Sequence, residues 1–98
     1  MRLPTLIPFV ATVACAHPMI ESGGFTVGKK ITEKSFETVE NRAAFELRCP
    51  KERLQLVVLN VNPIETSWPS QIGVDGCGVR AVYVPTAGGW VMNTKNAR

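Results

Sequence analysis

Apolar and polar positions follow two different periods along the chain, and the first of them is helical. A stripe of apolar side chains recurs at spacings of three and four, and it consists of Phe36, Val39 and Ala43. Thr32 suits the N-cap of such a helix, and Glu33 places a favourable negative charge in its first turn. We therefore expect one amphipathic helix that ends near Ala44 or Phe45.

The period changes at Pro50, which disfavours helix at the residue before it. Residues 45–49 are therefore expected to leave the helix and become extended. Leu54–Val61 is rich in Leu and Val on both faces, which predicts a strand at a central position in a sheet. Residues 60–70 contain two prolines and read as a connection, whose length would let Ile64 and Trp68 fold back on the core.

The C-terminal third of the chain predicts hairpins. Gln71–Val74 is a short strand candidate, and Asp75-Gly76 is a strong signal for a two-residue turn. The next strand candidate is residues 79–84, in which Val79, Ala81 and Tyr83 alternate with the residues that would face the other side. Gly88-Gly89 then offers a tight turn before a last strand over 90–93. The prediction is an α+β domain over residues 31–98, with one N-terminal helix packed on an antiparallel sheet of about four strands.

Two segments precede this domain. Residues 1–14 run from Arg2 through a short apolar stretch to small residues, which is the order of an export signal peptide. This stretch is too short to cross a bilayer, which takes about 20 residues. Residues 15–30 mix proline and glycine with polar residues and keep no period, so they are expected to form a tether.

The end of the signal, Val13-Ala14-Cys15, resembles that of bacterial lipoproteins, in which the cysteine after the cleavage point receives a lipid. The resemblance implies acylation of Cys15, and Ala16 rather than aspartate implies delivery to the outer membrane, facing the periplasm. Thr12 departs from the usual leucine, and Pro4 and Pro8 interrupt the apolar stretch. An ordinary secreted protein, or a buried N-terminal strand in a cytosolic one, are the alternatives.

The chain has three cysteines, and acylation of Cys15 leaves the pair Cys49 and Cys77. A disulfide between them suits a small exported domain and would stabilise it by about 3.5 kcal/mol. Two buried free thiols remain an alternative, as does a reactive Cys77 thiolate assisted by Arg80. A zinc site lacks ligands, because only His17 is available besides the two cysteines.

The second half of the chain resembles a group of short, uncharacterised bacterial envelope lipoproteins. The shared segments are Cys49-Pro50 with its surroundings, Leu54–Val57, the Gly-Cys-Gly and Ala-x-Tyr pattern within 73–83, and the terminal strand around Trp90. This resemblance covers about half the chain and implies no activity.

Composition and motifs exclude several functions. After loss of the signal, ten Lys and Arg face eight acidic residues, and Lys29-Lys30 is the only basic pair, so no nucleic-acid surface is expected. No serine, histidine or carboxylate pattern indicates a catalytic site, a cofactor site or a metal site. Three aromatic residues either pack in the core or line a ligand surface, namely Trp68, Tyr83 and Trp90.

We therefore expect a lipid-anchored envelope protein without enzymatic activity, which contacts another protein, peptidoglycan or lipid. A thiol-based redox enzyme or sensor that uses Cys77 is the first alternative. A soluble secreted ligand-binding domain is the second.

Overall fold

A computed structural model describes residues 17–93 of the chain. The predicted signal peptide and Cys15 lie outside the described residues. Two strands come first, β1 (Met19–Ser22) and β2 (Phe25–Gly28), and the helix α1 (Lys29–Glu46) and a 3₁₀ turn (Lys51–Arg53) follow. The remaining elements are the strands β3 (Gln55–Val61), β4 (Pro69–Gly76), β5 (Val79–Thr86) and β6 (Gly89–Met92).

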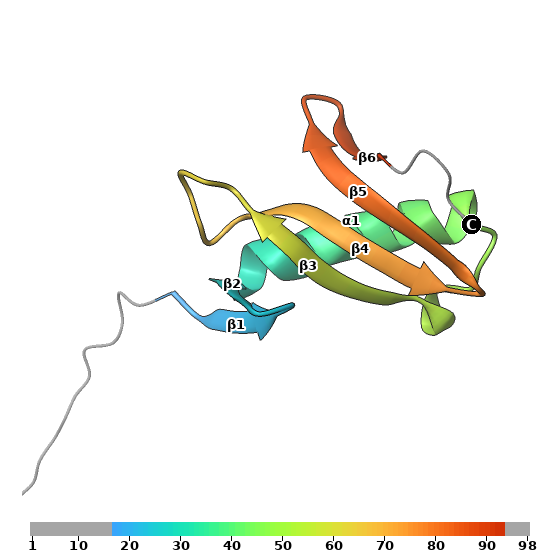
Figure 1. Ribbon diagram of the computed structural model, residues 1–98, viewed down its shortest axis with the longest axis horizontal. Coiled ribbons are helices and arrows are strands. Elements are labelled where there is room, and N and C mark those ends of the chain that lie inside the picture. Colours follow the sequence, from blue (N-terminus) through green and yellow to red (C-terminus); the bar gives the residue numbers. More distant parts are fainter. Residues whose placement is uncertain (1–16, 94–98) are drawn as a thin grey trace, which may run out of the picture.

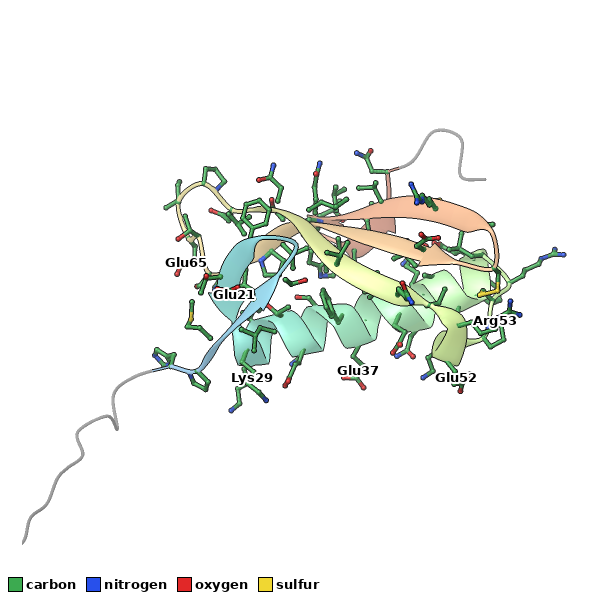
Figure 2. The ribbon with its side chains drawn as sticks, turned by 60° about the horizontal axis from the view of Figure 1, so that its bottom comes forward. Glu21, Lys29, Glu37, Glu52, Arg53 and Glu65 are labelled. Atoms are coloured by element: carbon green, nitrogen blue, oxygen red, sulfur yellow. A yellow bond between two sulfur atoms is a disulfide. The ribbon has the colours of Figure 1, made fainter. Side chains whose placement is uncertain are left out.

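The strands form two antiparallel sheets, a pair β1-β2 and a four-stranded sheet in the order β3-β4-β5-β6 (Figure 1). The helix lies along one face of the larger sheet (Figures 1 and 2). This confirms the predicted α+β class and the single helix on a four-stranded sheet, to which the structure adds the small second sheet.

The core lies between α1 and the inner face of the larger sheet. Val39 and Ala43 of the predicted stripe are fully buried, and Phe36 packs beside them. The sheet contributes Ile72 and Val74 from β4, together with Ala81 and Tyr83 from β5. The predicted alternation of β5 is thus confirmed, because Ala81 and Tyr83 are buried, Val82 between them is only partly buried and Arg80 is exposed.

The helix begins earlier than predicted, and its cap is different. Gly28 is the N-cap residue and offers no side-chain bond, whereas Thr32 lies buried inside the helix with no partner for its hydroxyl among the described residues. The N–H groups at the helix start bond to backbone instead: Gly28 N–H donates to the Ser67 carbonyl at 2.9 Å and Lys29 N–H to the Pro18 carbonyl at 3.0 Å. Tertiary contacts therefore replace the local cap.

The helix ends at Glu46, close to the predicted position, but residues 45–49 do not become extended. Arg48 adopts a left-handed conformation with φ 54°. The Arg48 N–H then bonds back to the Phe45 carbonyl and the Cys49 N–H to the Ala44 carbonyl. This pair of bonds is a Schellman motif, which satisfies the last helical carbonyls and reverses the chain before Pro50.

The segment expected to be a tether is instead largely a hairpin. Residues 19–28 form β1 and β2, joined by Gly23 and Gly24, which both have positive φ. The turn lies against β3, because Val58 N–H donates to Ser22 Oγ at 3.0 Å and a Cβ on Gly23 would stand 2.0 Å from the Val58 carbonyl oxygen. The folded part therefore starts well before residue 31.

The strand β3 lies at the edge of its sheet rather than at the predicted centre. Its apolar side chains still find cover, because Val58 is buried on the helix side and the β1-β2 turn covers the edge beside it. The following loop does not fold back. Asn62 Oδ1 accepts the N–H groups of Ile64 and Glu65 in a tight turn, and Ile64 and Trp68 are 92% and 52% exposed.

Both predicted turns in the C-terminal part move by one or two residues. Asp75 and Gly76 belong to β4 and pair with Arg80 and Val79, and the turn is Cys77-Gly78, whose φ angles of 53° and 78° fit a type I′ hairpin. The next turn is residues 87–88, because Thr86 pairs with Gly89. Gly76 is needed in the strand, since a Cβ there would stand 2.7 Å from the Arg53 carbonyl oxygen.

Tyr83 joins the sheet to the end of the helix. Its fully buried ring places the hydroxyl 2.5 Å from Glu46 Oε1, to which it donates, and Arg42 Nε binds the other oxygen of that carboxylate at 3.0 Å. Burial, and then the bond to Glu46 and its negative charge, raise the pKa of Tyr83 well above its ordinary value of 10.0. The hydroxyl is therefore held in its neutral, donating form.

We expect Tyr83→Phe to lower the free energy of unfolding by about 1–2 kcal/mol, because a hydrogen bond to a charged acceptor is lost. The wild-type contribution is full below pH 10 and falls above it, where the unfolded tyrosine ionises and the folded one does not. Denaturant unfolding at pH 7 and pH 11 measures both effects. Tyr83 is the only tyrosine, so phenolate absorbance follows its ionisation directly. An onset of that absorbance near pH 10 in the folded protein would contradict the assignment.

Candidate functional site

The predicted disulfide between Cys49 and Cys77 is confirmed, with an S–S distance of 2.06 Å and Cα atoms 5.9 Å apart. It ties the residue after the helix to the turn between β4 and β5. Cys49 is buried and Cys77 is exposed. Cys77 itself and Gly78 form the two-residue hairpin turn, and both have positive φ angles. The bond leaves neither sulfur as a thiol, and Arg80 pairs with Asp75 at 3.3 Å instead of assisting a thiolate.

The three aromatic candidates do not form one surface. Tyr83 is buried in the core and Trp90 packs partly against the same core, whereas Trp68 is exposed on the loop before β4. Packing therefore accounts for Tyr83 and Trp90, and Trp68 remains without a structural role in the core.

A groove runs over the outer face of the larger sheet, opposite the helix. In register across three strands, Val57 of β3, Gly73 of β4 and Val82 of β5 form its floor. Gly73 has no side chain to fill the space, and Leu59 leans over it, because a Cβ on Gly73 would meet the Leu59 Cδ1 at 3.0 Å. The result is an open groove of about 640 Å³ with an aliphatic floor.

One end of this groove is lined by polar side chains, those of Gln55, Asp75 and Arg80. Gln55 and Asp75 are partners across β3 and β4, and Asp75 forms its ion pair with Arg80 of β5. Arg80 and Asp75 remain largely exposed, so both stay accessible to a ligand. The arrangement offers apolar contact along most of its length and a paired charge at one end, which suits binding rather than proton transfer or nucleophilic attack.

Sequence reasoning missed this groove. A glycine inside a strand, with aliphatic residues on the strands at either side, is a signal for a close approach or a hollow. Gly73 carries that signal, but it can be interpreted only when its neighbours Val57 and Val82 are known, and these come from different strands.

Residues 17–93 contain neither a cluster of metal ligands nor a helix that could span a membrane. No group of three or more His, Cys, Asp or Glu side chains in this part of the chain is arranged to hold a metal ion. Within the same range, no helix has both the length and the apolar character needed to cross a membrane.

Comparisons of the chain with protein-family models, with curated proteins and with solved structures found no match. The functional assignment therefore depends on the residues themselves.

We expect the double substitution Cys49→Ala and Cys77→Ala to lower the free energy of unfolding by about 3.5 kcal/mol, because the bridge closes a loop with a sequence separation of 28. Denaturant unfolding measures this loss. Reduction of the wild type should give a similar loss, and reduction of the double variant none. Alkylation of Cys77 in the native protein before any reductant is added would contradict a permanent bridge and support the redox alternative.

Proposed function

We propose that this protein is a lipid-anchored component of the cell envelope that binds a protein partner on the outer face of its sheet. The binding role is supported by one observation, which is that the two faces of the larger sheet differ. The helix α1 covers the inner face, and the outer face has an aliphatic groove. The β1-β2 turn approaches Val57 at the β3 edge of the groove, and apolar surface left open beside it is typical of an interaction site.

The character of the groove favours a protein partner over peptidoglycan. Val57, Leu59 and Val82 offer aliphatic contacts, whereas a glycan needs many hydrogen-bond partners and commonly an aromatic platform. The sheet also stays open along β6, where an extended segment of a partner can add main-chain contacts. No enzymatic role is proposed, because the groove brings together only the Asp75–Arg80 pair and one amide.

The lipid anchor is proposed from the signal-like sequence and from the roles of the three cysteines. The Cys49–Cys77 bridge uses two of the three cysteines, which leaves Cys15, at the end of the signal-like segment, as the third. We propose that Cys15 carries the lipid, and that Ala16 after it permits delivery to the periplasmic face of the outer membrane.

Intact mass of the protein extracted from host membranes tests the anchor. We expect a chain that starts at Cys15 and carries the added mass of a diacylglycerol and an acyl chain. Cys15→Ser should abolish both the cleavage and the adduct, while Cys77→Ser, as a control at another cysteine, should keep them. A chain cleaved without an adduct would indicate the secreted alternative.

The groove is tested by a photo-crosslinking residue placed at Leu59 in living cells. We expect one discrete crosslinked partner, identified by mass spectrometry. Its yield should fall about tenfold when Val57→Asp is added, because burial of an unpaired carboxylate costs more than about 1.4 kcal/mol. The matched control places the crosslinker at Thr38 on the exposed side of α1, where no such product is expected. Equal products from both positions, or none from Leu59, would refute the groove as the binding site.

A further inference from the structure

Large apolar side chains are exposed at the end of the domain where the described chain begins. Met19 is 46% exposed, Ile64 92% and Trp68 52%. Met19 comes from β1, and Ile64 and Trp68 come from the loop before β4. These two segments lie at the same end of the domain, because Gly28, the partner of Met19 in β2, donates its N–H to the Ser67 carbonyl, and Met19 and Trp68 line one hollow. We call this end the N-terminal pole and define it as residues 17–19, 29–31 and 64–68.

The N-terminal pole has a hollow in its surface and carries charged groups. Pro18, Met19 and Trp68 line the hollow together with Lys29, Lys30 and Glu65. Lys29 is paired with Glu33 at 2.9 Å, while Lys30 makes no ion pair within residues 17–93. Figure 2 shows Lys29 and Glu65 at the end of the molecule where the described chain begins. Exposed apolar groups beside lysines are the combination that suits a lipid headgroup layer.

With Cys15 acylated as proposed, the short chain between Cys15 and Pro18 would hold this pole close to the membrane. Pro18 is fixed to the domain, since its carbonyl accepts the Lys29 N–H at 3.0 Å. Cys15 precedes Pro18 by three residues in the sequence, and an extended chain spans at most about 3.6 Å per residue, so chain length alone limits the distance between the two residues to about 11 Å. A single helix of a partner is already about 10–12 Å thick, so no folded partner fits between the pole and an acylated Cys15.

We infer that the N-terminal pole rests in the membrane surface, with Ile64 and Trp68 inserted at the boundary of headgroups and acyl chains. This inference rests on the proposed acylation of Cys15. Trp68 suits that depth because its indole is apolar with one polar N–H, and Ile64 adds an exposed side chain that is purely apolar. Lys29 and Lys30 face the headgroups, where anionic lipids attract them. The residues that line the outer groove are all different from those at the pole, so both surfaces can be used together.

Quenching of tryptophan fluorescence by lipids with brominated acyl chains tests the contact. The chain has two tryptophans, so Trp90→Phe leaves Trp68 alone and Trp68→Phe leaves Trp90 alone as the control. Each acylated protein is reconstituted into vesicles of brominated or ordinary phospholipid that contain no other protein. We expect Trp68 emission to fall roughly twofold in brominated vesicles, because it lies at the membrane boundary, and Trp90 emission to stay unchanged.

Two further substitutions sharpen the test in the variant that keeps only Trp68. Ile64→Asp should reduce the quenching, because a charge replaces an inserted apolar side chain. Phe45→Asp should leave it unchanged, since Phe45 is similarly exposed at 84% but lies at the opposite end of α1.

Intact mass separates the two ways in which these ideas can fail. Acylated protein whose Trp68 is not quenched overturns the contact between pole and membrane and leaves the anchor standing. Protein without the lipid on Cys15 overturns the proposed anchor, and the inference falls with it.

Discussion

The packing of α1 against one face of the four-stranded sheet is the contact on which the rest of the structure depends. A helix of 18 residues buries Val39 and Ala43 against the inner positions of β4 and β5, and it is held at both ends. At the start of the helix, the Pro18 and Ser67 carbonyls accept the backbone N–H groups of Lys29 and Gly28. At its end, the Cys49–Cys77 disulfide and the hydrogen bond from Tyr83 to Glu46 connect the helix to the sheet. Because one helix covers one face, the aliphatic groove over Gly73 stays open.

Features decided by local periodicity were predictable from the sequence. The helical stripe, the alternation of β5 and the pairing of Cys49 with Cys77 each follow from residue spacing or residue count. Features decided by distant contacts were not. The Asp75-Gly76 pattern predicts a turn, but Gly76 serves a close approach to the Arg53 carbonyl, and the turn moves to Cys77-Gly78. Likewise the short β1 and β2 strands gain their stability from β3, which no local pattern indicates.

The candidate sites divide in the same way. The bridge was predictable because cysteines are few, whereas the groove needs three strands in register and the N-terminal pole needs two separate segments. Trp68 shows the difference. As a tryptophan near the start of a strand it predicts core packing, yet the turn made by Asn62 directs the loop outward and leaves the ring half exposed. Its exposure is therefore a property of the loop rather than of the residue.

The bond between the Pro18 carbonyl and the helix start has a consequence for how the protein meets other molecules. With Cys15 acylated as proposed, only the three residues from Cys15 to His17 would connect the lipid to the domain at Pro18. The domain would then diffuse in the plane of the leaflet and could not extend far from its surface. A partner must then also be confined near that leaflet or reach down to it. Encounters between two membrane-bound molecules depend on their surface density, so a groove with modest intrinsic affinity suffices to keep such a pair together.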